Sequence, residues 1–118
     1  MAYVQGFVIP VATGDKAAYI DAARQAWALL QDYGALSVTE CWEADVPEGK
    51  LTSFPMAIKR APGEAVVFSW VIWPDKAAAD RCFASVESDT RWNDLPMPFD
   101  GKRMIHGGFE PIFTAGNV

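Results

Sequence analysis

The segment EAVVFSWVIW, residues Glu64–Trp73, is the most apolar stretch of the chain. Successive side chains of a β-strand point to opposite faces of the sheet. Both sets are largely hydrophobic here: one is Val66, Phe68, Trp70 and Ile72, and the other is Val67, Ser69, Val71 and Trp73. A strand that is apolar on both faces is covered on both sides, which predicts a central position in a sheet.

The residues before this strand predict a strand, a helix and a second strand. Residues 3–11 (YVQGFVIPV) are rich in β-branched and aromatic side chains and stop at Thr13-Gly14. Residues 15–33 have apolar side chains at three- and four-residue spacing and precede Gly34, which suits the end of a helix. Residues 35–44 (ALSVTECWEA) alternate between the two faces of a half-polar strand, with Glu40 on the more apolar face.

The remaining segments are less regular. Residues 45–61 predict a hairpin or excursion, with a short strand at residues 56–59. Pro74-Asp75 opens a helix at residues 76–87, and residues 89–100 predict a loop with one helical turn. Residues 102–113 predict a final strand, in which Gly107-Gly108 indicates a bulge or a close approach by another backbone.

The resulting order, β-α-β-β-α-β, predicts a ferredoxin-like α+β sandwich. Its four-stranded antiparallel sheet has the first and third strands in the centre and both helices on one face. With 118 residues the chain fits one domain, residues 1–118.

The second face of this sheet needs a cover of its own. Apolar residues on both faces of the central strands would leave a patch larger than the roughly 300–600 Å² typical of a monomer. We therefore expect a homodimer in which two sheets pack face to face. The alternative is that residues 45–61 fold across the face as a lid.

Composition restricts the classes of partner. Ten basic and fifteen acidic residues give a net charge of −5, and the basic residues are scattered, which disfavours nucleic acid as a partner. No apolar run approaches the roughly 20 residues of a membrane span, and the N-terminus lacks the pattern of a secretory signal. The sequence predicts a cytoplasmic protein whose Cys41 and Cys82 are reduced, packed thiols.

Three long blocks resemble those of the bacterial YbaA-like proteins, a family without an assigned activity. They are ECWEADVPEGKLTSFPMA (40–57), VVFSWVIWPDK (66–76) and PMPFDGKRMIHGGFEP (96–111). The resemblance implies membership of the dimeric α/β-barrel superfamily, in which two ferredoxin-like sheets enclose a barrel, and it implies no reaction. A tyrosine is usual in that family where this chain has His106, so the resemblance implies no role for an imidazole there.

Three side chains are candidates for acid–base chemistry. His106 is the only histidine, and it could act as a general base or ligand, or simply hydrogen-bond its surroundings in a strand. Glu40 and Glu110 lie in predicted edge strands among apolar neighbours. Either carboxylate could have a raised pKa if buried, face solvent, or pair with Arg103 across a dimer edge.

Candidate ligand-binding residues are aromatic or lie in a stiff loop. Tyr3, Trp42 and Trp70 could line a pocket for a flat organic ligand or belong to the core. Arg103, in the FDGKR loop at residues 99–103, could lie on the rim of a site or fix the entry of the last strand. No metal-ligand or phosphate-binding signature occurs, so neither a metal nor a cofactor is predicted.

Three functions stay open on the sequence. The first is binding of a small organic molecule without catalysis. The second is a cofactor-free monooxygenase or isomerase, suggested by fold-level analogy, that uses His106, Glu110, Trp70 or Tyr3 in a cavity between the helices and the sheet. The third is a purely structural or interaction subunit.

Overall fold

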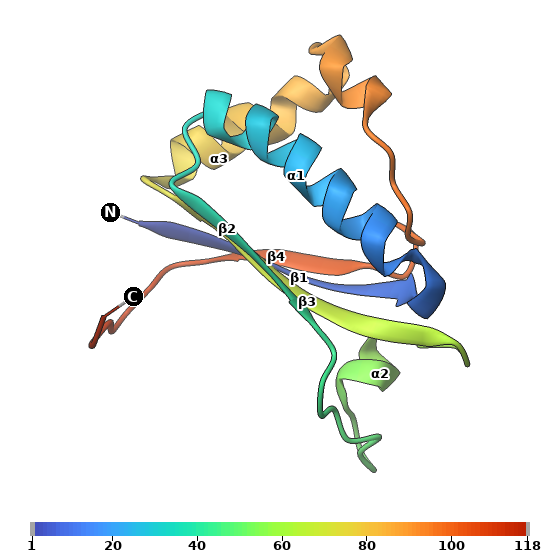
Figure 1. The fold of residues 1–118 in the computed structure, drawn as a ribbon. Helices are drawn as coiled ribbons and strands as arrows, with labels where there is room; N and C mark the ends of the chain where they lie inside the picture. Colours follow the sequence, from blue (N-terminus) through green and yellow to red (C-terminus); the bar gives the residue numbers. More distant parts are fainter. Residues whose placement is uncertain (1, 118) are drawn as a thin grey trace.

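A four-stranded antiparallel sheet of order β2-β3-β1-β4 organises the computed structural model, which describes residues 2–117 (Figure 1). The elements are β1 (Tyr3–Ala12), α1 (Lys16–Asp32), β2 (Ser37–Trp42), α2 (Phe54–Ala57), β3 (Glu64–Trp73), α3 (Lys76–Ala84) and β4 (Ile105–Phe109). Short 3₁₀ helices occupy Thr13–Asp15, Ser85–Glu87 and Thr90–Asp94. The predicted ferredoxin-like βαββαβ fold, with β1 and β3 in the centre, is confirmed.

Helices α1 and α3 cover one face of the sheet, which we call the helix face (Figure 1). The backbone of Gly34, with φ of 102°, ends α1 as the sequence predicts. The Gly34 amide donates to the carbonyl of Gln31 and the Ala35 amide to that of Leu30, both at 3.0 Å. These two bonds satisfy carbonyl groups at the helix end, and the positive φ explains the glycine.

The core of the helix face is built on alternate residues of β3. Val67 and Trp73 are 1% and 0% exposed, and Val71 lies between them in the same row of side chains. The indole nitrogen of Trp73 donates to Gln5 Oε1 on β1 at 2.8 Å, so this buried ring has its polar atom satisfied.

The prediction of a short strand at residues 56–59 is wrong, because α2 occupies this part of the excursion. Ser53 Oγ accepts a hydrogen bond from the Met56 amide at 3.0 Å, and Pro55 lies in the first turn. A serine cap followed by proline favours the start of a helix, and this local signal outweighed the apolar composition.

Residues 45–61, which contain α2, cover one end of the second sheet face, which we call the open face (Figure 1). Ile58, 1% exposed, packs against Val8 and Val66 at this end. The ring of Phe54 meets that of Phe68 with centroids 5.8 Å apart. Hydrophobic side chains remain exposed over the rest of the face: Phe68 at 44%, Ile105 at 44% and Phe109 at 62%.

Strand β4 is shorter than predicted and has no bulge. Its register runs without interruption from Val4 opposite Phe109 to Val8 opposite Ile105. The close approach expected at Gly107-Gly108 comes from a side chain, since a Cβ on Gly108 would lie 1.6 Å from the Tyr3 hydroxyl. Glycine is therefore required here by space rather than by backbone conformation.

The cysteines are unpaired, with Cys82 buried and Cys41 partly buried. Burial raises the pKa of the Cys82 thiol to about 11, so it stays protonated at neutral pH. Over residues 2–117, no helix combines the length and the apolar character needed to cross a membrane.

We expect Trp73→Ala to lower the free energy of unfolding by about 3–5 kcal/mol, because it empties a fully buried aromatic site. Urea denaturation monitored by circular dichroism measures this loss. Leu51→Ala is the control, since Leu51 is 100% exposed and its truncation should change stability by less than about 0.5 kcal/mol. Equal effects of the two substitutions would contradict the assignment of Trp73 to the core.

Candidate functional site

A cavity of about 390 Å³ lies between the helix face of the sheet, α1 and the segment that joins α3 to β4. We call it the α1 cavity, and residues 85–104 the covering segment. Phe7, Ile9 and Glu40 contribute from the sheet. Helix α1 contributes Tyr19 and three alanines, and the covering segment contributes mainly apolar side chains, among them Trp92 and Phe99. The cavity exists because alanine side chains are too short to fill the space between the helix and the strands.

One carboxyl–phenol pair supplies most of the polarity of the α1 cavity. The Tyr19 hydroxyl donates a hydrogen bond of 2.6 Å to Glu40 Oε1. Burial raises the pKa of Glu40, and hydrogen bonds from the Tyr19 and Ser69 hydroxyls act in the opposite direction. Burial and the neighbouring Glu40 raise the pKa of Tyr19, so the phenol stays protonated and acts as a donor.

The two members of the pair differ in their access to the cavity. Tyr19 is 6% exposed, whereas Glu40 is exposed at the border of the open space, although its hydrogen bond with Tyr19 is partly buried. Water that enters the cavity can therefore reach the carboxyl group, and an apolar occupant would remove that water. Filling the cavity strengthens the effect of burial on Glu40.

Glu40 begins a row of side chains that crosses the helix face. Ser69 lies opposite Glu40, Phe7 opposite Ser69, and His106 opposite Phe7. Three strand spacings of about 4.8 Å separate the two ends of this row by roughly 14 Å. His106 is exposed at the far edge, with its ring centroid 6.2 Å from that of Phe7. The structure thus places His106 beyond the wall of the α1 cavity rather than inside it.

The other predicted site residues are dispersed. Glu110 is exposed beyond the end of β4, and Tyr3 lies over Gly108. Trp70 pairs in register with Gly6 and lies on the open face. The prediction that Trp70 shares a cavity between helices and sheet with His106 is wrong, because alternate residues of a strand face opposite sides.

Arg103 and Trp42 make contacts within the protomer. Arg103 pairs with Glu64 at 2.7 Å and with Asp100 at 2.8 Å, which fixes the end of the covering segment. Trp42 packs on the helix face, and the Lys16 ammonium lies 5.4 Å from the centroid of its ring. Neither residue lines the α1 cavity, but Trp42 lines a second, smaller hollow near the end of β2.

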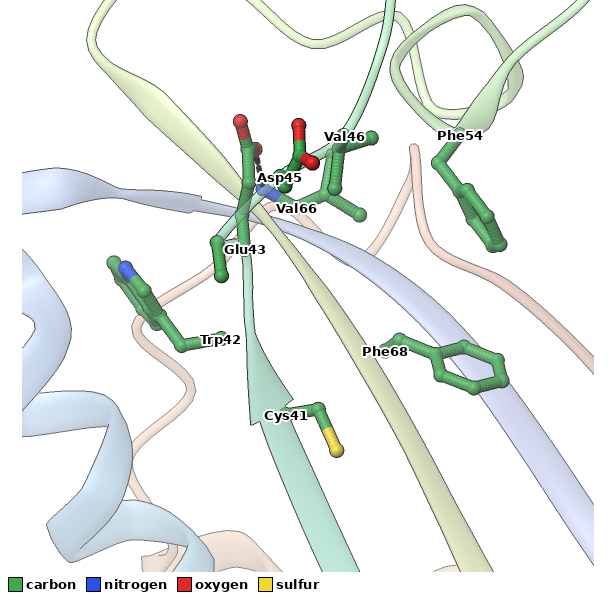
Figure 2. Close-up of a pocket in the computed structure, with 9 residues that line it drawn as sticks. Cys41, Trp42, Glu43, Asp45, Val46, Phe54, Val66 and Phe68 are labelled. Carbon is green, nitrogen blue, oxygen red and sulfur yellow. Dashed lines mark hydrogen bonds between the residues drawn. The ribbon is translucent and has the colours of Figure 1, made fainter.

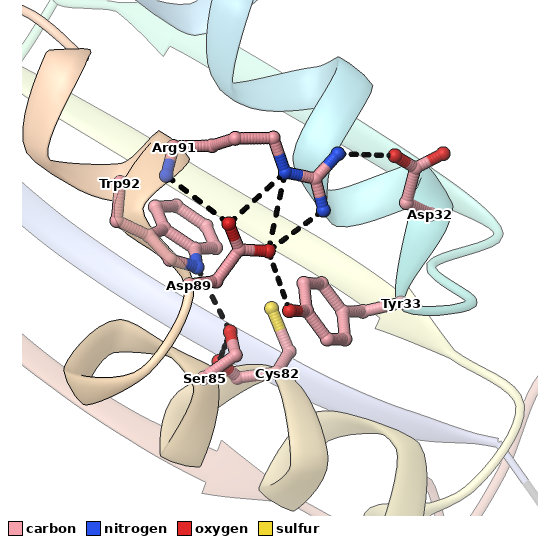
Figure 3. Close-up of polar contacts among 7 residues, drawn as sticks. All are labelled: Asp32, Tyr33, Cys82, Ser85, Asp89, Arg91 and Trp92. Carbon is pink, nitrogen blue, oxygen red and sulfur yellow. Dashed lines mark hydrogen bonds and ion pairs between the residues drawn. The ribbon is translucent and has the colours of Figure 1, made fainter.

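The start of the covering segment is fixed by an ion-pair network (Figure 3). Asp89 accepts from the Tyr33 hydroxyl at 2.7 Å and pairs with Arg91, which also reaches Asp32 at 2.7 Å. The hydrogen bonds from Arg91 and from the Tyr33 hydroxyl hold the pKa of Asp89 well below its usual range. This network anchors the 3₁₀ helix that carries Trp92 to the end of α1, and so it positions one wall of the cavity.

A smaller hollow of about 280 Å³ lies between the end of β2 and α2 (Figure 2). Cys41, Phe54 and Phe68 line it together with Glu43. Arg60 lies 2.5 Å from the Glu43 carboxylate and lowers the pKa of that group. Arg60 therefore neutralises the Glu43 carboxylate, whereas Asp45, which also lines the hollow, is exposed to solvent.

Sequence reasoning missed Tyr19 and most of the covering segment. Tyr19 lies within the predicted helix at residues 15–33 and fits its apolar spacing, and its hydroxyl bonds to a residue 21 positions away. A usable signal was the carboxylate of Glu40 on the apolar face of its strand, because an acid among apolar side chains needs a hydrogen-bond donor. Among residues 2–117, no cluster of three or more His, Cys, Asp or Glu side chains is arranged to hold a metal ion.

Comparisons with known proteins identify relatives of this chain. Residues 2–101 match the profile of a family described as a protein of unknown function, DUF1428. The YbaA protein of Escherichia coli K12, described as uncharacterized, is 48% identical over 114 residues, which cover 95% of this chain and 97% of that protein. The predicted resemblance to YbaA-like proteins is therefore confirmed.

Solved structures share the fold at low sequence identity. A variant of SnoaB, a cofactor-independent oxygenase from Streptomyces nogalater, has a TM-score of 0.62 and 18% identity over 98% of both chains. A dimeric ferredoxin-like protein from an uncultured marine organism has a TM-score of 0.61 and 11% identity over 98% of this chain and 100% of that one. These likenesses show that the chain has a ferredoxin-like fold.

We expect Glu40→Gln to change how stability depends on pH. A raised pKa means that folded Glu40 binds its proton more tightly than the unfolded residue does, so the native protein loses stability as pH rises through that pKa. Glutamine keeps an acceptor for Tyr19 and cannot ionise. Urea denaturation between about pH 4 and pH 8 should show the variant gaining stability relative to the native protein as pH rises. A constant difference would contradict the raised pKa.

Proposed function

This chain belongs to the DUF1428 family of proteins of unknown function, and we propose that it binds a small organic molecule in the α1 cavity. The observation that carries the proposal is the Glu40–Tyr19 pair, set at 2.6 Å among apolar walls. Ligand sites combine a mostly apolar cavity of about 300–1,000 Å³ with a few polar groups that orient the ligand.

The apolar lining of the cavity supports an occupant. Apolar surface of Ala22, Ala23 and Ala26 borders the cavity, and covering it with an apolar ligand is favourable. Glu40 faces the same space with a phenol, rather than a cation, as its partner. A ligand that fills the cavity and bonds to the carboxyl group would cover this apolar surface and give Glu40 a further partner.

A metabolite library screened by thermal shift tests this proposal. A ligand at about 100 times its dissociation constant stabilises the fold by about 2.7 kcal/mol. We expect Ala26→Phe to abolish the shift by filling the cavity, whereas Ala28→Phe, on the exposed side of the same helix, should preserve it. If no compound shifts the melting temperature, or if Ala26→Phe leaves every shift intact, the binding proposal fails and a structural or interaction subunit becomes the better reading.

Catalysis is the second candidate, favoured by the raised pKa of Glu40. A carboxylate with a raised pKa at the edge of an apolar cavity suits the abstraction of a proton from a bound molecule. That step begins the reaction of an isomerase, and it also begins a cofactor-free oxygenation in which molecular oxygen is the oxidant. Product analysis with any ligand from the screen, in air and under nitrogen, separates both reactions from simple binding.

The proposal includes a homodimer formed through the open face. Phe68 and Phe109 are 44% and 62% exposed on this face, and α2 covers only one end of it. A second copy of the sheet would bury this surface by the same packing that the helices provide on the other side. The dimeric ferredoxin-like protein with a similar fold supports this arrangement.

We expect Trp70→Glu to convert a dimer into a monomer, because it places a charge in the centre of the apolar open face. Size-exclusion chromatography with light scattering measures the mass. Phe83→Glu is the matched control, since Phe83 is 70% exposed on α3, in the opposite layer, and the dimer should persist. A native protein that is monomeric at micromolar concentration, or a Trp70→Glu variant that stays dimeric, would contradict the proposal.

A further inference from the structure

Glu40 differs from the paired carboxylates of this protein in having no cationic partner. Glu43 pairs with Arg60 at 2.5 Å and Glu64 with Arg103 at 2.7 Å. Over residues 2–117, no Lys or Arg nitrogen lies within ion-pair distance of Glu40, whose partner is a neutral phenol. The α1 cavity therefore holds a negative charge, when Glu40 is ionised, that the protein itself does not neutralise.

The walls of the cavity favour a positive charge in the space next to Glu40. None of the lining side chains is Lys, Arg or His, so an anionic ligand would face the carboxylate without a compensating group. The aromatic rings of Phe7, Trp92 and Phe99 line the same space. Rings of this kind attract an organic cation through their negative faces.

Metal cations fit this site poorly. Hard cations require several oxygen ligands, and Glu40 is the only acidic side chain that lines the cavity. An ammonium group needs fewer partners, because one carboxylate and aromatic faces stabilise it. The Tyr19 hydroxyl donates to Glu40 Oε1. Because each carboxylate oxygen has two lone pairs, Oε2 can still accept a hydrogen bond from a ligand in the presence of the Ser69 hydroxyl.

We propose that the α1 cavity selects hydrophobic amines, whose protonated nitrogen donates to Glu40 Oε2 while the apolar body fills the space between α1 and the covering segment. This inference rests on the proposed binding function and names the class of its ligand. It assigns Glu40 the role of counter-ion and Tyr19 that of a positioning residue, since the phenol fixes the carboxyl group through one oxygen.

Three probes with the same ring system test the selection: naphthylmethylamine, naphthylmethanol and naphthoate. Isothermal titration calorimetry at neutral pH should show the amine binding about tenfold or more tightly than the alcohol, because a hydrogen bond to a charged group is the stronger one. Naphthoate should not bind. In Glu40→Gln the amine and the alcohol should bind equally, and in Glu43→Gln, a control on the opposite face, the preference for the amine should persist.

The outcomes separate this inference from the proposed function. Equal binding of amine, alcohol and acid, or a preference for the amine that survives in Glu40→Gln, overturns amine selection and leaves a binding cavity. Amine selection is also overturned if library compounds without an amine shift the melting temperature of the native protein but not that of Ala26→Phe, because such compounds would bind in the cavity. If none of the three probes binds and the library gives no shift, both proposals fail.

Discussion

The central strands carry hydrophobic side chains on both faces, so burial of each face of the sheet is favourable. On the helix face, α1 and α3 bury Val67 and Trp73 to 1% and 0% exposure. On the open face, Ile58 and α2 cover one end, and Phe68 remains 44% exposed. Burial of apolar area is the dominant favourable term in folding and in association. The helices bury the apolar side chains of one face, and the proposed second copy of the sheet would bury those of the other face.

The cavity arises where the helical cover is incomplete. Helix α1 presents alanines and Tyr19 toward the strands, so it spans the sheet without filling the space beneath it. The covering segment closes the side, fixed at its start by Asp89 and Arg91 and at its end by Arg103. Polar interactions at the two ends thus hold an apolar wall over a carboxylate. The proposed ligand would therefore be held mainly by apolar walls and one carboxyl–phenol pair rather than by many polar contacts.

Alternation, helical spacing and the order of the elements were enough to predict the strand order and the glycine that ends α1, whereas β4 and α3 are shorter than predicted. They did not predict α2, because a serine cap and a proline decide a helix of only four residues. The hydrogen bond between Tyr19 and Glu40 depends on how α1 packs over β2. The periodicity of a helix or a strand predicts which side chains share a face, but it does not predict how two elements pack together. His106 is a candidate from the sequence because it is the only histidine, whereas its distance from Glu40 follows from the strand register, which places it opposite Phe7 on the edge strand β4.

The chemistry of the α1 cavity depends most directly on the ionisation of Glu40. Carbon-13 labelling of the glutamate side chains permits NMR titration of the carboxyl groups, and comparison with Glu40→Gln assigns the signal of Glu40. We expect a midpoint above the value of about 4.3 for an unperturbed glutamate, because burial raises the pKa of this group. We also expect the midpoint to fall when naphthylmethylamine is bound, since a nearby cation favours the ionised form. A midpoint at or below the unperturbed value in the unliganded protein would show that Glu40 is not held in an apolar site.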